Sequence, residues 1–117
     1  MDLEKIHVNV SIEHIKNGSQ RQCYDCPIAH AIIESISTNK IDEINYYREV
    51  SVTDEIRLPN TFKNFTLYNI YIPIEMQIWI NNFDKGLEVS PFSFDIEQTD
   101  KYPKPPRAKI TNLVFNL

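Results

Sequence analysis

Two cysteines, a proline and a histidine fall within eight residues and are the side chains best suited to chemistry in this sequence: Cys23-Tyr24-Asp25-Cys26-Pro27-Ile28-Ala29-His30. Two thiolates at this spacing can reach one tetrahedral zinc ion, and His30, one helical turn beyond Cys26, can supply a third ligand. The pattern therefore allows a zinc site made by Cys23, Cys26 and His30. No second Cys-x-x-Cys or His-x3-His follows, so the alternative is that the thiols pack as small apolar side chains.

The same two cysteines also allow a thiol redox activity. A thiolate near the start of a helix is stabilised by free amides and by the helix dipole, and this lowers its pKa. Against this activity, Pro27 follows the second cysteine instead of lying between the two, and Asp25 adds a negative charge. Nucleophilic catalysis would need an imidazole and an orienting group that converge on a thiol. The sequence contains no complete set of this kind, so it predicts a protein that is not an enzyme.

A third interpretation of this stretch is an anion-binding site. A helix that begins at Pro27 has free amides at its start, where a phosphate group can be held. We expect Arg21 to pair with such a group and Tyr24 to stack on the ligand, while Asp25 would compete for the same amides. The predicted ligand-binding residues are the following: Arg21, Tyr24, Asp25, His30 and Arg48. For His30 the alternative is a hydrogen-bonded structural histidine.

The hydrophobic pattern predicts the elements that position these residues. Apolar residues at the helical period, with Pro27 and Pro73 in first turns, predict helices at 27–37 and 73–83, the second with Met76, Trp79, Ile80 and Phe83 on one face. Ser11 as N-cap and Gly18, which can take a positive φ, predict a short helix between them. Alternating or β-branched and aromatic residues predict strands at 5–10, 47–53, 65–72 and 89–96, and a short edge strand at 110–115. Residues 39–46 are expected to form a weakly ordered connector.

These elements predict an α+β fold with a mixed, mostly antiparallel sheet of about four strands and about three helices packed mainly on one face. We expect residues 1–97 to form a single domain. Residues 98–117 are expected to form a proline-rich carboxyl-terminal arm that contains the edge strand. The tyrosine-rich strand at 65–72 makes a homodimer one expected assembly.

Composition limits the partners that we expect. The 117 residues carry a net charge of −4, and the 12 basic side chains are scattered among 16 acidic ones, so nucleic acid is not an expected partner. No apolar run is long enough to span a membrane, and the first residues lack the pattern of a secretory signal. We therefore expect a cytoplasmic protein with no membrane partner and, unless zinc binds, no cofactor.

The chain resembles a family of small Cys-x-x-Cys-Pro proteins carried by bacteria and their phages. The residues that carry the resemblance span positions 6–96 and are the following: Glu13-His14-Ile15, Gly18, Cys23-x-x-Cys26-Pro27-Ile28-Ala29, Trp79-Ile80, Phe83-Asp84-x-Gly86 and Pro91-Phe92-x-Phe94. The resemblance implies a compact domain and a bacterial or phage setting, and it implies no particular chemistry.

Three functions follow from these observations. The first is a phage-encoded binding protein without enzymatic activity, which sequesters a small anionic ligand such as a nucleotide signal or blocks a host protein in the cytoplasm of a bacterial cell. The second is a small zinc-stabilised docking domain, and the third is a thiol oxidoreductase.

Overall fold

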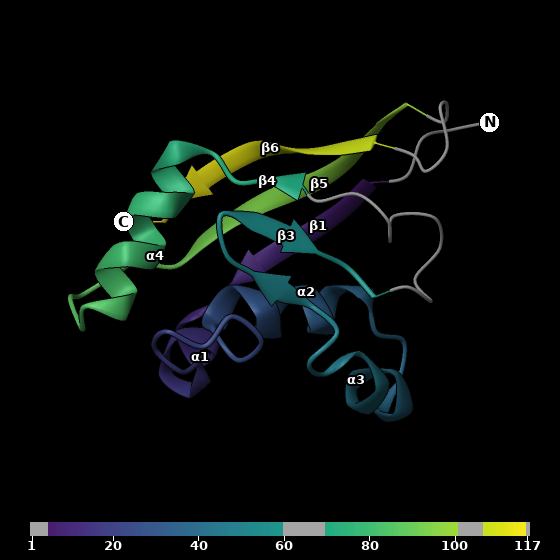
Figure 1. Ribbon diagram of the computed structural model, residues 1–117, viewed down its shortest axis with the longest axis horizontal. Coiled ribbons are helices and arrows are strands. Elements are labelled where there is room, and N and C mark those ends of the chain that lie inside the picture. Colours follow the sequence, from purple (N-terminus) through teal and green to yellow (C-terminus); the bar gives the residue numbers. More distant parts are fainter. Residues whose placement is uncertain (1–4, 60–69, 101–106, 117) are drawn as a thin grey trace.

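The computed structural model describes residues 5–59, 70–100 and 107–116, and over these residues the chain has the predicted α+β fold. The described strands form two antiparallel three-stranded sheets (Figure 1), so the single sheet that we predicted is divided in two. One sheet has the order β1-β5-β6, with β1 at Lys5–Val10, β5 at Phe92–Asp100 and β6 at Arg107–Phe115. The other has the order β2-β3-β4, with β2 at Ser51–Val52, β3 at Glu55–Arg57 and β4 at Ile70–Tyr71.

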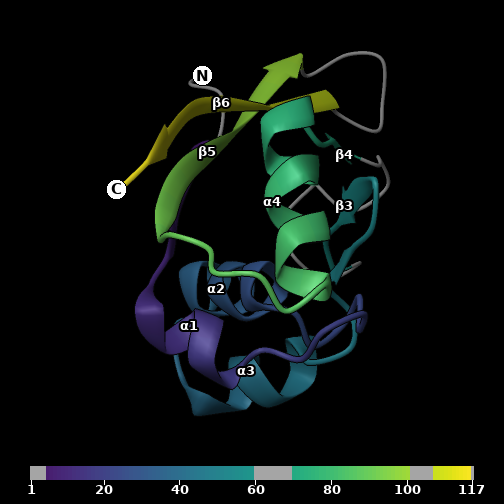
Figure 2. The same cartoon turned by 90° about the vertical axis from the view of Figure 1, so that its left-hand side faces the viewer.

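Four helices accompany the sheets in the described part of the chain: α1 (Ile12–Asn17), α2 (Pro27–Ile36), α3 (Lys40–Tyr46) and α4 (Ile74–Asp84). Figures 1 and 2 show that α1, α2 and α3 gather at one end of the molecule, while α4 stands apart from them beside the sheets. The helices therefore lie in two places, whereas we had predicted that they pack mainly on one face. The difference follows from the division of the sheet, because two separate sheets leave two surfaces for helices to cover.

The strand β1 confirms the predicted alternation. Its apolar residues Ile6, Val8 and Val10 are buried, its polar residues are exposed, and Val8 lies opposite Phe94 of the antiparallel neighbour β5. The strand β5 begins three residues later than predicted. Pro91 immediately before it has no amide hydrogen, and the indole Nε1 of Trp79 donates a hydrogen bond to the carbonyl of Ser90 at 2.7 Å.

The core is one apolar cluster shared by both sheets, α2 and α4. Met76, Trp79 and Phe83 are buried as the stripe on α4 predicted, and Ile80 is half-buried. The Trp79 ring stacks on Phe83 with the centroids 5.8 Å apart. The predicted edge strand is present as β6, which pairs with β5 and begins at residue 107 instead of 110.

Two predictions between residues 39 and 72 were wrong. Residues 40–46 form the helix α3 instead of a connector, because the side chain of Asn39 accepts a hydrogen bond from the amide of Asp42 at 2.9 Å and so caps a first turn. The strand predicted at 47–53 is reduced to β2, because Tyr47 ends α3 and Arg48 has a φ of 70°. Of the strand predicted at 65–72, residues 65–69 lie outside the described residues and Ile70–Tyr71 forms β4.

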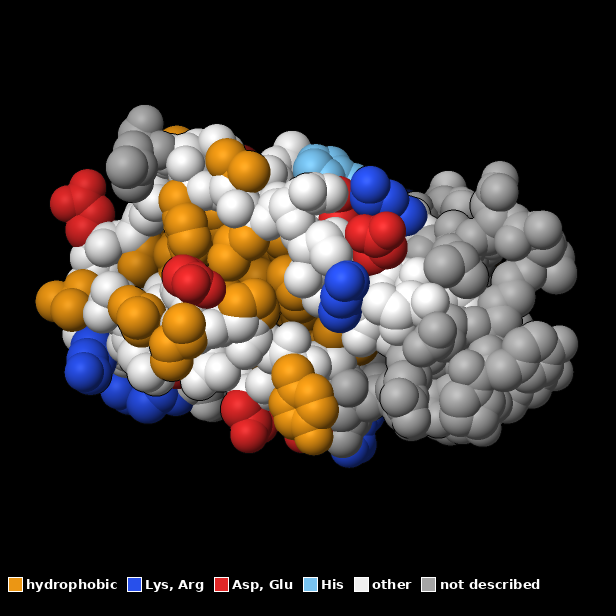
Figure 3. Space-filling model, turned by 90° about the horizontal axis from the view of Figure 1, so that it is seen from above, with side chains coloured by type: hydrophobic (Ala, Val, Ile, Leu, Met, Phe, Trp, Pro, Cys, Tyr) orange, Lys and Arg blue, Asp and Glu red, His pale blue; other side chains and the backbone are white. Residues whose placement is uncertain are grey.

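Apolar side chains also gather on the outer surface on the side where α4 lies (Figure 3). On α4, Ile74 and Ile78 are more than half exposed, and so is Val114 on β6. Among the described residues, none of the helices combines the length and apolar character that crossing a membrane requires. The predicted homodimer stays a prediction.

Candidate functional site

A surface groove lies where α1, α2 and α3 meet, and we call it the three-helix groove. Its volume is about 660 Å³, within the range of sites that bind small molecules or short peptide segments. Each of the three helices contributes to its lining, which consists of Ser11, Glu13, His14, Asn17, His30, Ile33, Glu34, Glu43, Ile44 and Tyr47.

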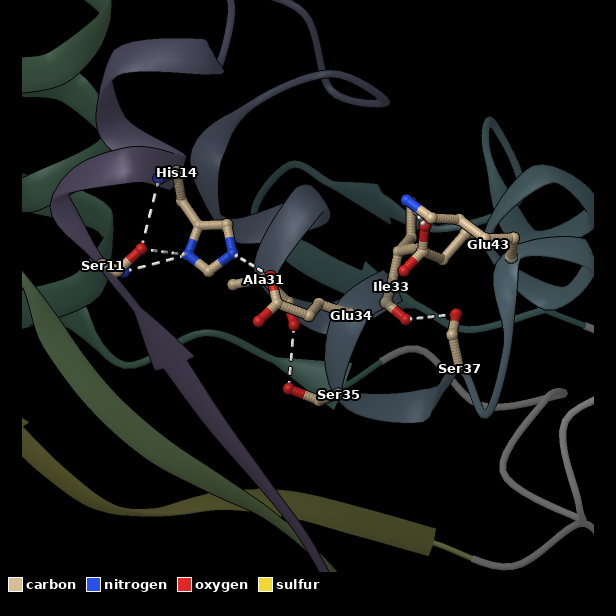
Figure 4. A network of polar contacts seen from close by, with 9 residues as sticks. Ser11, His14, Ala31, Ile33, Glu34, Ser35, Ser37 and Glu43 are labelled. Carbon is tan, nitrogen blue, oxygen red and sulfur yellow. Dashed lines mark hydrogen bonds and ion pairs between the residues drawn. The ribbon is translucent and has the colours of Figure 1, made fainter.

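A chain of short polar contacts joins Ser11, His14 and Glu34 at this groove (Figure 4). The Ser11 amide donates to Nδ1 of His14 at 2.9 Å, so the proton of the neutral imidazole is on Nε2, which donates to Oε2 of Glu34 at 2.7 Å. The Ser11 hydroxyl also lies 2.9 Å from Nδ1, and its oxygen accepts a hydrogen bond from the His14 amide at 3.3 Å. A hydroxyl, an imidazole and a carboxylate in this order also make up the catalytic triad of a hydrolase.

Helix capping explains the contacts between Ser11 and His14. The bond from the His14 amide to the Ser11 hydroxyl and the bond returned to the Ser11 amide make a capping box at the start of α1, with histidine in the place of the usual glutamate. The N-cap role predicted for Ser11 is therefore confirmed. The imidazole is oriented by this cap, and we assign it a structural role.

Asp25 and His30, two of the predicted ligand-binding residues, meet at a second polar cluster beside the groove. Nε2 of His30 lies 2.8 Å from Oδ1 of Asp25, an ion-pair distance at an angle outside that of a hydrogen bond. Asp25 also accepts hydrogen bonds from the hydroxyls of Ser19, at 2.6 Å, and Tyr47, at 3.3 Å. The hydrogen bond from Ser19 is the main cause that lowers the pKa of Asp25; burial opposes it, and His30 and Tyr47 support it. This cluster ties the segment before α2 to the end of α3.

The start of α2 is closed to an anion, because Cys26 already satisfies its amides. Cys26 is the N-cap and is buried, and its Sγ accepts from the amide of Ala29 at 3.4 Å. The His30 amide donates to the Cys26 carbonyl at 3.1 Å, and Pro27 has no amide hydrogen. Burial raises the pKa of the Cys26 thiol to about 11, against the opposing effect of the Ala29 and Ile28 amides. The thiolate that zinc binding or redox chemistry requires is thus disfavoured at Cys26.

We expect the two thiols to differ sharply in reactivity. At about pH 8, iodoacetamide should alkylate the partly exposed Cys23 first, because a pKa of about 11 leaves about one Cys26 thiol in a thousand ionised. Intact mass measurement should show one rapid modification per folded chain and two after denaturation. The variant Cys23→Ser is the control and should take up almost no label while folded. Equal rates at both cysteines in the wild type would contradict this expectation.

The other predicted ligand-binding residues are not brought to this site. The Arg21 amide donates to Oδ1 of Asp84 at 2.8 Å, and its guanidinium donates to the Asp84 carbonyl at 3.3 Å. Tyr24 is exposed and lines neither groove. Arg48 is not among the residues that line the three-helix groove, and its guanidinium carbon lies 5.6 Å from the ring centroid of Tyr47.

The three predicted zinc donors are likewise divided between two places. Cys23 and Cys26 line a second, smaller groove of about 330 Å³ together with Asp54 and Asp84, whereas His30 lines the three-helix groove. Within residues 5–59, 70–100 and 107–116, no three His, Cys, Asp or Glu side chains are grouped so that they could hold a metal ion.

Sequence reasoning missed the wall of the three-helix groove that contains Glu43 and Ile44, because it missed α3. The signal was present in Thr38-Asn39-Lys40-Ile41-Asp42, where an N-cap residue is followed three positions later by a carboxylate. The contact of Glu34 with His14 joins residues 20 apart in the chain, and no local pattern predicts it.

Known proteins provide no assignment for either groove. When the chain is compared with family models, with curated proteins and with solved structures, nothing matches in any of the three. The function therefore has to be inferred from the geometry of the chain itself.

Proposed function

We propose that this chain is a binding protein without enzymatic activity that blocks a partner protein, and that the three-helix groove is its binding surface. The observation that carries the proposal is the exposed apolar face of α3. Ile44, in the wall of the groove, is 74% exposed, and Ile41, one turn earlier, is 68% exposed.

Physical chemistry makes this face unusual. A helix of seven residues is too short to be stable through its backbone alone and normally depends on burying an apolar face. In α3 no residue is fully buried: Tyr46 is half-buried against the core, and the two isoleucines are exposed. A partner that covers Ile41 and Ile44 would supply the burial that α3 lacks.

The alternative form of this function, sequestration of a small anionic ligand, has less support. The lining of the three-helix groove contains no lysine or arginine, and the amides at the start of α2 are satisfied by Cys26. The zinc-stabilised and oxidoreductase alternatives both need a thiolate at Cys26, which burial disfavours. The resemblance to proteins carried by phages is the reason to propose a host protein as the partner and the bacterial cytoplasm as the setting.

The variant Ile44→Arg is expected to abolish partner capture without unfolding the chain, because this side chain is exposed and a charge there would have to be buried against the partner. Wild-type protein and variant, each tagged, would be used to recover proteins from a bacterial lysate and would be compared by quantitative mass spectrometry. The amount of a groove-binding partner that is recovered should be at least about tenfold lower with Ile44→Arg than with the wild type. The purified partner should also bind the wild-type protein.

The matched control is Ile74→Arg on α4, which places the same charge at an isoleucine that is 62% exposed outside the groove. Recovery that survives Ile44→Arg but is lost with Ile74→Arg would place binding on the apolar surface over α4 and contradict the proposed site. A thermal-shift screen of nucleotides tests the alternative, since a nucleotide that raises the melting temperature of the protein would favour a small anionic ligand.

A further inference from the structure

The charge of the three-helix groove carries information about its occupant. Each of the three helices that surround it contributes one glutamate to the lining: Glu13 from α1, Glu34 from α2 and Glu43 from α3. No lysine or arginine belongs to the lining. The groove is therefore bordered by carboxylates on three sides.

The positive groups near these carboxylates do not cancel their charge. Nζ of Lys40 lies 3.7 Å from Oε2 of Glu43, but this lysine is 91% exposed and its pairing is weak in water. His14 accepts a backbone hydrogen bond at Nδ1, so it reaches Glu34 as a neutral donor. Nε2 of the His30 ring lies 2.8 Å from Oδ1 of Asp25, and the Arg48 guanidinium lies over the ring of Tyr47.

The lining of the groove also has an apolar part. Ile33 on α2 and Ile44 on α3 lie in the lining together with the ring of Tyr47. An apolar strip bordered by negative charge complements a segment that has an apolar face and basic side chains at its margins. A second copy of this chain would bring three more carboxylates to the same place, so charge disfavours self-association through this groove.

We propose that the occupant is a basic amphipathic segment of the partner protein. Its apolar side chains lie on Ile33, Ile44 and Tyr47, and its lysine or arginine side chains pair with Glu13, Glu34 and Glu43. This inference rests on the proposed function and adds the chemical class of the partner. Because the glutamates lie at the rim, their pairing speeds association and selects the sign of the partner's charge.

The test uses a fluorescein-labelled peptide of about 14 residues in which leucines at helical spacing alternate with lysines. Fluorescence anisotropy at low salt measures its affinity for the full-length protein, beside a second peptide with glutamate in place of every lysine. We expect the lysine peptide to bind, the glutamate peptide to bind at least about tenfold more weakly, and the affinity to fall as salt is added.

The double variant Glu13→Lys/Glu43→Lys reverses two of the three rim charges and leaves the contact between His14 and Glu34 in place. It should weaken binding of the lysine peptide about tenfold or more and improve binding of the glutamate peptide. The matched control is Glu75→Lys/Glu88→Lys, which makes the same change in net charge at two exposed residues outside the groove. Melting curves of both double variants establish that they are folded.

Three outcomes overturn the inference: no binding of the lysine peptide at about 100 µM, equal binding of the two peptides, or equal loss with the two double variants. If one of these is found while Ile44→Arg still removes a partner from the lysate, the groove remains the binding surface and only the basic class of partner is wrong. If Ile44→Arg also has no effect, the proposed function fails as well.

Discussion

Replacing Phe92 with alanine is expected to lower the free energy of unfolding by about 3–5 kcal/mol. The side chain is fully buried in the apolar cluster that both sheets share. Its ring centroid lies 4.9 Å from that of Trp79 on α4, 5.9 Å from Phe94 on its own strand and 5.4 Å from Phe115 on β6. Alanine would leave a cavity that these rings cannot fill without moving α4. A loss of this size is a large part of the stability of a typical domain.

Urea denaturation followed by circular dichroism measures the effect. Phe92→Leu, which retains most of the volume, should cost clearly less than Phe92→Ala. Val114→Ala, on the neighbouring strand and half exposed, should change the stability by less than about 0.5 kcal/mol. A loss below about 1 kcal/mol for Phe92→Ala would contradict the central position that we assign to this ring.

The parts of the fold that could be predicted are those fixed by local pattern. The alternation of Ile6, Val8 and Val10 predicts β1 because one face of a strand is buried, whatever covers it. Pro27 at the first turn of α2 and the buried stripe on α4 follow in the same way from rules that act within one or two turns.

The division into two sheets could not be predicted, because β2, β3 and β4 have only two or three residues each in the described chain. Strands this short show no measurable alternation, and they exist because their partners across the sheet supply the hydrogen bonds. The candidate site depends on such distant contacts too. It is built by the packing of α1 and α3 against α2, and the contact between His14 and Glu34 is part of that packing.

The Cys-x-x-Cys-Pro stretch shows that residues suited to metal binding or catalysis can serve to stabilise the fold. Cys26 caps α2, Pro27 fills the first position of the helix, where an amide would lack a partner, and the Cys23 carbonyl accepts from the amide of Val52 at 2.9 Å. Cys26 at the start of α2 and Cys23, three residues before it, thus connect this helix to β2. These contacts give both cysteines a structural role.

The variant Gly18→Ala is expected to destabilise the protein by about 1–3 kcal/mol, through a clash with Pro27. A Cβ at Gly18 would lie 2.5 Å from both the nitrogen and the Cδ of Pro27, and neither atom belongs to a flexible side chain. The positive φ that we predicted for Gly18 is wrong, since its φ is −76°. The requirement for glycine is therefore the close approach of the end of α1 to the start of α2. Because α1 is one wall of the three-helix groove, Gly18→Ala should also weaken binding there.

A double-mutant cycle with Pro27→Ala separates this clash from other causes. Removing the ring carbons of Pro27 relieves the overlap with Cδ and Cγ and leaves the overlap with the backbone nitrogen, so Gly18→Ala should cost less in the Pro27→Ala background than in the wild type. Gly86→Ala is the contrasting control. Gly86 has a φ of 78°, which alanine adopts only with strain, so this variant should lose about 1–2 kcal/mol of stability through its backbone conformation. That cost should be the same in both backgrounds. If the effects of Gly18→Ala and Pro27→Ala were additive, the two residues would not be in the contact that fixes α1 on α2.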